Sequence, residues 1–301
     1  MKKNKKFIFI IIGILLVVCV AIVAVVLLSK KDDSYRIIKV YEYEGDGIVN
    51  RESIGDIEPY NNMVLESGDN IKLNTGLMTL KLDDDKYVYV EEKTEFSLEA
   101  TGTTEDSKTS INLKSGAITN EIQNKLNDES SYEINTPNST MAVRGTTYRV
   151  EIYEDDKGTT YTRVSVFEGK VTTKLKYADG TVEEKEVGVD AGKEVIIYED
   201  DTTTDYLGDV TDIDYSTLPD EVLLIVGDVL DMDESMTDEE IVRNFKGPFT
   251  VTFIYNGGVF GTQTVNKGEC AQIPILMPAP SGGWDFDFTT PITEDIEIEW
   301  K

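Results

Sequence analysis

The chain has 301 residues, of which 40% are hydrophobic and 29% are charged, a composition typical of a folded protein. Its net charge is −28, and beyond residue 31 there are 23 basic against 57 acidic side chains, which argues against binding to nucleic acid. The sequence contains no His, so the commonest general base and the commonest zinc ligand are both missing, and its two Cys are Cys19 and Cys270.

The first predicted element is an uncharged run of 22 residues from Phe7 to Leu28. As a helix it would be about 33 Å long, which matches a hydrocarbon core of about 30 Å. Four Lys precede the run and no acid does, so the N-terminus is expected in the cytoplasm. We therefore expect a cytoplasmic tail at 1–6, one transmembrane α-helix at 7–28 and an extracellular ectodomain of a cell-membrane protein. A cleaved signal peptide is the alternative, although its apolar region would be only about 7–15 residues long.

Residues 35–200 are predicted to form a β domain made of short strands. Apolar and polar residues alternate at 78–82, 87–90, 148–152 and 162–167. Turns are predicted between such segments, among them Gly45-Asp46-Gly47, Asp83-Asp84-Asp85, Ser115-Gly116 and Asp156-Lys157-Gly158. This pattern favours a mainly β fold, an elongated antiparallel β sandwich or meander, in which only 118–127 could hold a short helix.

Residues 201–247 are predicted to be an acidic linker with short helices. Helices are expected at 218–231 and 237–245, and in the second Thr237 is followed by Glu240 at the spacing of a capping box. From residue 248 to 301 the strand pattern returns, with turn residues at 256–258 and at 267–268.

A series of motifs in the β domain keeps a single order along the chain: Leu65-Glu66-Ser67-Gly68-Asp69, Thr75-Gly76, Thr79–Asp85, Asn135-Thr136-Pro137, Ala142-Val143-Arg144-Gly145-Thr146, Val164–Val171 and Ala191–Val195. Together these motifs resemble the FecR domain, a family named for the ferric-citrate regulator. The resemblance implies a β fold and a location outside the cytoplasm.

Residues of these motifs are candidates for a structural or partner-contact role: Thr136, Pro137, Arg144, Gly145, Thr146, Glu168 and Gly169. Pro137 is expected to end a strand and Gly145 to allow a bulge or a close backbone approach. Arg144 needs a charged partner, for which Glu168 is one candidate, and we expect this ion pair to be partly buried.

FecR-domain proteins were first known as membrane-spanning regulators, in which a cytoplasmic part regulates a sigma factor and an exported part receives a signal from an outer-membrane transporter. Here the expected tail of six residues is too short to hold a sigma factor. We therefore expect a non-enzymatic, membrane-anchored envelope scaffold, sensor or binding module, whose partner is another envelope protein or a cell-wall component. The alternative is an anti-sigma-like regulator that works through a partner's transmembrane helix.

The C-terminal segment carries a second resemblance, on Val251-Thr252-Phe253, Asn256-Gly257-Gly258, Gly283-Trp284, Pro291-Ile292-Thr293 and Trp300. These residues resemble the internalin-type B-repeat, or Listeria–Bacteroides repeat, a small β-grasp-like module of bacterial surface proteins. Trp284 and Trp300 would then anchor a small core, and exposed binding aromatics are the alternative.

No catalytic, cofactor-binding or metal-binding residue is predicted. Acidic residues are too numerous for paired carboxylates to indicate catalysis, and no glycine-rich nucleotide-binding loop occurs. The acidic run at 228–240 departs from a calcium-binding EF-hand because Met236 stands where Gly is required. Weak calcium association with an acidic turn such as 83–85 is left open.

Overall fold

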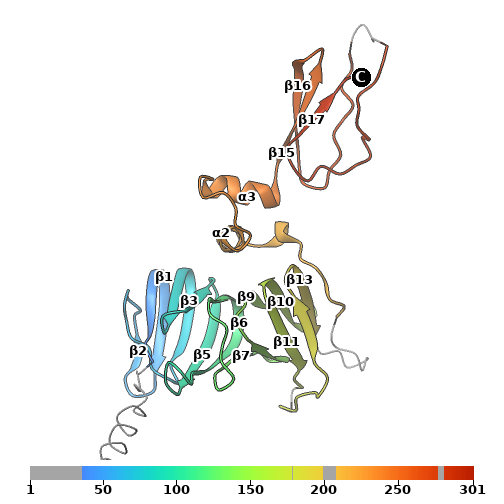
Figure 1. Cartoon of the computed structure of the whole chain (residues 1–301). Helices are drawn as coiled ribbons and strands as arrows, with labels where there is room; N and C mark the ends of the chain where they lie inside the picture. The colour runs from blue at the N-terminus through green and yellow to red at the C-terminus, as the bar shows by residue number, and fades with distance from the viewer. Residues whose placement is uncertain (1–35, 178, 199–207, 277–280) are drawn as a thin grey trace, which may run out of the picture.

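A computed structural model gives the fold and describes residues 36–177, 179–198, 208–276 and 281–301 (Figure 1). The described residues form two β-sheets. The larger sheet has 14 strands: β1 (Ile38–Arg51), β2 (Gly55–Ile57), β3 (Asn70–Leu82), β4 (Lys86–Val90), β5 (Thr94–Thr101), β6 (Lys108–Ile122), β7 (Ser131–Asn135), β8 (Ser139–Val143), β9 (Thr147–Glu154), β10 (Thr160–Glu168), β11 (Lys170–Leu175), β12 (Val187–Asp190), β13 (Lys193–Tyr198) and β14 (Thr211–Asp212). The four strands predicted from alternation lie within β3, β4, β9 and β10 and are confirmed.

The larger sheet folds over on itself into two layers that share the long strands β1, β3 and β6. The C-terminal half of β6 pairs with β4 and β9, whereas its N-terminal half pairs with β5 and β7. One hydrophobic cluster contains inward residues from both layers, for example Val88 and Val164 from one and Phe96 and Ile134 from the other. The long strands therefore hold the two layers together covalently.

Strand β6 must bend sharply, because Ser131 lies beside Lys108 in a parallel pairing of β6 with β7. A straight strand from residue 108 to 122 would be about 46 Å long. The nine steps from residue 122 to 131 can span at most about 32 Å. The bend in β6 brings its two ends close enough for the short connection after Ile122 to reach Ser131 beside Lys108.

The bend lies at Gly116, whose φ is 78°. A Cβ there would lie 2.6 Å from the Cα of Thr94, so only glycine fits. The buried Thr94 hydroxyl accepts a hydrogen bond from the Ala117 amide at 3.0 Å and donates to the Ala117 carbonyl at 3.1 Å. The Thr94 side chain thus supplies an acceptor for the Ala117 amide and shares the Ala117 carbonyl with the Glu91 amide.

Several features of the predicted fold class are corrected by the structure. The turns predicted at 45–47 and at 115–116 lie inside β1 and β6, where their glycines bend strands rather than end them. The short helix considered at 118–127 is wrong, because residues up to Ile122 belong to β6. The sheet is also not purely antiparallel, since β6 and β7 run parallel.

The fold-class prediction of a transmembrane helix ahead of the β domain is likewise not supported. No helix among the described residues is long and apolar enough to cross a membrane. The predicted span 7–28 and the predicted tail 1–6 lie outside the described residues.

Two short helices follow the larger sheet, α2 (Asp220–Val229) and α3 (Asp238–Lys246), after the 3-10 turn η1 (Tyr215–Thr217). The capping box predicted at Thr237 and Glu240 is confirmed. The helices share a buried apolar cluster with Phe167 of β10, which points away from the sandwich core. Residues 211–245 therefore pack onto the β domain rather than forming a free linker, and Figure 1 shows α2 and α3 between the large sheet and the C-terminal strands.

The C-terminal residues form a separate three-stranded sheet with its own core. Its strands are β15 (Phe249–Tyr255), β16 (Gly258–Val265) and β17 (Ile296–Glu299), in the order β16-β15-β17. The β15–β16 hairpin is antiparallel, whereas β17 runs parallel to β15. The core contains Val251, Phe253 and Ile298, with Trp284 packed against it.

Two fully buried tyrosines, Tyr132 and Tyr148, give a testable alkaline response. Burial raises the pKa of each phenol well above its ordinary value. Unfolded tyrosine ionises near pH 10, so the folded state holds protons that the unfolded state loses above that pH. Stability from these groups is therefore present below about pH 10 and should be lost as the pH rises further.

We expect the urea midpoint, followed by far-ultraviolet circular dichroism, to fall steeply between about pH 10 and about pH 12. The Tyr148→Phe variant should lose less stability over the same interval, because its phenyl ring cannot ionise. An equal loss in both proteins would contradict the account.

Candidate partner-binding groove

Two motif loops meet at one end of the sandwich. The loop after β8 contains Gly145, and the tight turn between β10 and β11 contains Gly169; their φ angles are 72° and 77°. A Cβ on Gly169 would lie 2.7 Å from the carbonyl oxygen of Gly145, and a Cβ on Gly145 would lie 2.9 Å from the Cα of Lys125. Glycine at both positions lets three chain segments pack backbone against backbone.

A groove with a volume of about 670 Å³ opens beside this junction. Its walls come from Ile122, Gln123 and Lys125, from residues 142–145 and from the turn at 168–170, with Thr172 beyond it. A second hollow on the other side of Arg144 has a volume of about 240 Å³ and is lined in part by Asp128 and Glu133. Arg144 therefore forms the wall between two neighbouring hollows.

Arg144 does not have the environment expected from the sequence. Its guanidinium donates to the Leu126 carbonyl oxygen at 2.9 Å and to the Asp128 carboxylate at 2.7 Å, and its side chain is 54% exposed. The expected partly buried pair with Glu168 is wrong. The reason is strand alternation: Val143 points into the core, so Ala142 and Arg144 on either side of it point outward.

The exposed setting of Arg144 predicts a small stability effect. Its partner Asp128 is 87% exposed, and ion pairs between exposed groups contribute about 0–1 kcal/mol. The Arg144→Ala substitution should lower the free energy of unfolding by less than about 1 kcal/mol in urea titrations. A loss of several kcal/mol would show that the residue has a structural role after all.

Thr136 and Thr146, by contrast, are buried structural residues. Thr136 donates to the side-chain oxygen of Asn138, whose amide group donates to the carbonyls of Thr160 and Ile197 at 3.0 and 3.2 Å. The Thr146 hydroxyl donates to the Lys170 carbonyl and so ties the two motif loops together. Pro137 is exposed in the turn between β7 and β8, where it follows the end of β7.

The motif loops lie inside a segment that matches a known family. Residues 70–172 match the FecR protein family. The match includes Thr136, Arg144 and Glu168, as well as the junction of the two glycine loops. Comparison with curated proteins gives no match.

Two crystal structures of a candidate anti-sigma factor from Parabacteroides distasonis are similar to the chain at low identity, 16% and 17%. Each alignment has a TM-score of 0.36 and covers 48% of this chain and 58% of the other. The chain therefore spans little more than half the length of these relatives.

The FecR-matched segment also contains a buried arginine that the sequence analysis missed. Arg149 in β9 is only 4% exposed and holds Glu91 through two hydrogen bonds of 2.7 and 2.8 Å. Burial opposes the charge of Arg149, but hydrogen bonds and charges from Glu91 and Glu151 outweigh it, so its pKa lies above the ordinary value. Glu91 precedes β5 and Arg149 follows the motif loop, so no local pattern in the sequence pairs them.

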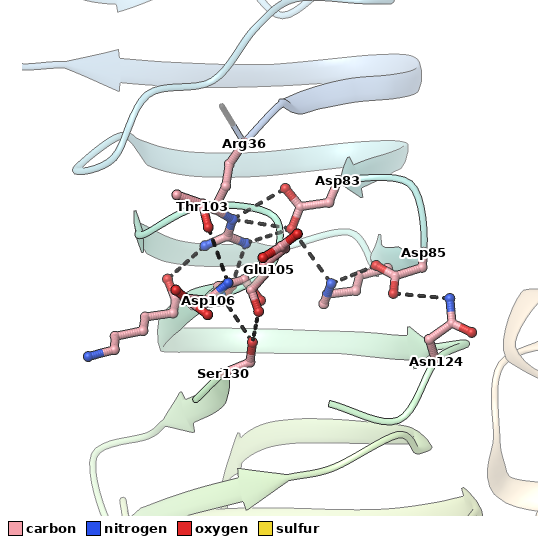
Figure 2. Close-up of polar contacts among 12 residues, drawn as sticks. Arg36, Asp83, Asp85, Thr103, Glu105, Asp106, Asn124 and Ser130 are labelled. Atoms are coloured by element: carbon pink, nitrogen blue, oxygen red, sulfur yellow. Dashed lines mark hydrogen bonds and ion pairs between the residues drawn. The ribbon is translucent and has the colours of Figure 1, made fainter. Parts of the chain in front are cut away.

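Two carboxylates of the acidic turn at 83–85 are paired closely with cations, whereas that of Asp84 is exposed. Arg36 donates two hydrogen bonds of 3.2 Å and one of 3.0 Å to Asp83, and Lys86 lies 2.6 Å from Asp85. Figure 2 shows Arg36 reaching into a group that includes Asp83, Thr103, Glu105 and Asp106. In the described part of the chain no group of three or more possible ligands is placed to hold a metal ion.

Trp284 and Trp300 pack against each other in the C-terminal sheet domain. Their rings are 5.3 Å apart and nearly perpendicular, and Trp284 also lies 5.1 Å from Phe253. Both indole N–H groups donate to backbone carbonyls, of Pro274 and Ser281 respectively. Trp284 therefore packs against the core of the small domain, and Trp300 packs against Trp284.

The groove cations that the sequence analysis did not single out are Lys125 and Lys170. Lys125 belongs to the short return segment between β6 and β7, and Lys170 follows the Gly169 turn. The bend of β6 and the return segment bring Lys125 to the groove, whereas the pairing of β11 with β8 places Lys170 there.

Proposed function

We propose that the chain is a non-enzymatic FecR-like regulatory protein that acts by binding a partner protein in the groove beside Arg144. The observation that carries the proposal is the position of Arg144. It lies in the most recognisable motif of the FecR-matched segment, yet its side chain is exposed and its ion pair is expected to contribute little to stability. An exposed charged residue on a loop held by a rigid scaffold is typical of a binding surface.

The composition of the chain supports binding rather than catalysis. The sequence contains no His, and the groove combines cations, a single carboxylate and short side chains. Such a mixture can recognise a partner through charge and hydrogen bonds, but it offers no nucleophile with an adjacent base.

An extracytoplasmic location is part of the same proposal. The uncharged run at 7–28 with its flanking Lys is typical of a segment that directs a chain to or through the membrane. The C-terminal domain, with its resemblance to the internalin-type B-repeat, would be a second contact module for another envelope component. Its mixed three-stranded sheet and paired tryptophans are compatible with a small autonomous module.

The proposal is tested by photocrosslinking in the native cells. A photoreactive amino acid at Thr172 faces the groove, whereas one at the exposed Lys157 lies in a turn outside the residues that line it. We expect a discrete crosslinked protein from position 172 and none from position 157. Equal crosslinking from both positions, or none from 172, would contradict partner binding in the groove.

A further inference from the structure

The groove concentrates positive charge on a strongly acidic protein. Lys125, Arg144 and Lys170 line it, against the single carboxylate of Glu168. The whole chain has a net charge of −28, so three cations around one groove depart from the general surface. Local positive charge of this kind favours a negatively charged ligand, and it contributes more to specificity than to affinity.

These cations are available to a ligand. The Lys125 ammonium makes no hydrogen bond or ion pair with any described residue. Arg144 and Lys170 pair with Asp128 and Asp190, whose side chains are 87% and 70% exposed. Such pairs are weak and screened by water, so a ligand carboxylate can replace them at little cost.

The remaining lining favours a peptide over a phosphate polymer. Glu168 can only accept hydrogen bonds when ionised, so it needs a donor from the ligand. A peptide supplies backbone N–H donors, whereas a polyphosphate chain has none and would be repelled by Glu168. The short, exposed side chain of Ala142 leaves room for a ligand backbone to lie close to this part of the groove.

We infer that the groove binds an extended acidic segment of a partner protein, with carboxylates held by Lys125, Arg144 and Lys170 and backbone N–H groups facing Glu168. This inference rests on the proposed function and adds the chemistry of the partner. The volume of about 670 Å³ accommodates a few residues of an extended chain.

The test uses the full chain and a fluorescent peptide of about ten residues that alternates Glu and Thr, with a matched peptide in which Gln replaces Glu. Fluorescence anisotropy at low salt should show the Glu peptide binding at least about tenfold more tightly than the Gln peptide, with affinity falling as salt rises. Equal binding of the two peptides, or no binding of either, would overturn the inference.

Charge reversal locates the binding. The double variant Lys125→Glu and Lys170→Glu should weaken binding of the Glu peptide by at least about tenfold, whereas the control pair Lys93→Glu and Lys157→Glu should leave it unchanged. Polyphosphate that binds while the Glu peptide does not would also overturn the inference.

The experiments distinguish failure of partner binding in the groove from failure of the acidic-segment inference. Suppose that a partner crosslinks from Thr172 in cells with equal yield in the wild type and in the Lys125→Glu, Lys170→Glu variant. This result would contradict binding of an acidic segment but would still support the groove as a binding site. Loss of the crosslink in the variant would support both.

Discussion

Replacing Arg149 with Ala should lower the free energy of unfolding by about 3–5 kcal/mol. The Arg149 side chain is 4% exposed, and it holds Glu91 and Glu151 at 2.7 and 3.0 Å. Without it, Glu91, which is only 21% exposed, loses its cation, while Glu151, which is 26% exposed, keeps only the longer contact of 3.5 Å with Arg163. Removing one member of such a group costs far more than the pair contributes, because the remaining charges lose their compensation.

Urea unfolding followed by far-ultraviolet circular dichroism measures this loss, with Arg144→Ala as the matched control. Both tryptophans, Trp284 and Trp300, lie in the C-terminal domain, so Trp fluorescence reports that domain separately. We expect Arg149→Ala to shift the circular dichroism transition and leave the Trp transition in place. Equal and small shifts for the two arginine variants would contradict the described burial.

Replacing Gly116 with Ala should cost about 2–5 kcal/mol, because two penalties act together. A non-glycine residue at the φ of 78° is strained, and its Cβ would lie 2.6 Å from the Thr94 Cα and 2.7 Å from the Lys93 carbonyl oxygen. Both contacts are with backbone atoms at the start of β5 and in the turn before it, which cannot move without disturbing the bend of β6.

Gly158 provides the control for this substitution. Its φ is 81°, but a Cβ there would meet no atom within 4 Å. Gly158→Ala should therefore show only the backbone strain, about 1–2 kcal/mol. Similar urea midpoints for the two variants would show that the bend in β6 tolerates a side chain and that the strand is straighter than described.

The sequence predicted the regular parts of this fold because they depend on local patterns. Alternation located β3, β4, β9 and β10, and the Thr237–Glu240 spacing located the start of α3. In the sequence, the bends at 45–47 and 115–116 cannot be distinguished from turns, because glycine with polar neighbours is typical of both features. A bend within one strand is distinguished from a turn between two strands only by the strand pairing, in which each half of the long strand pairs with a different partner.

The site was predicted in part. The motifs drew attention to Arg144, Gly145, Glu168 and Gly169, and the structure brings these four residues together around one groove. The environment of Arg144 was misjudged because its apolar neighbours outweighed strand alternation in the interpretation. No pattern in the sequence around Lys125 indicates a binding site, since its place in the groove depends on how the segment between β6 and β7 crosses the fold.

The central claim is that Arg144 serves binding and not stability, and one paired measurement tests it most directly. The Arg144→Glu variant is compared with the wild type for its urea midpoint and for its crosslinking yield from position 172 in the native cells. The account predicts a midpoint that changes by less than the equivalent of about 1 kcal/mol, together with loss of the crosslinked partner. A lowered midpoint with crosslinking retained would contradict it, because Arg144 would then stabilise the fold and play no part in holding a partner.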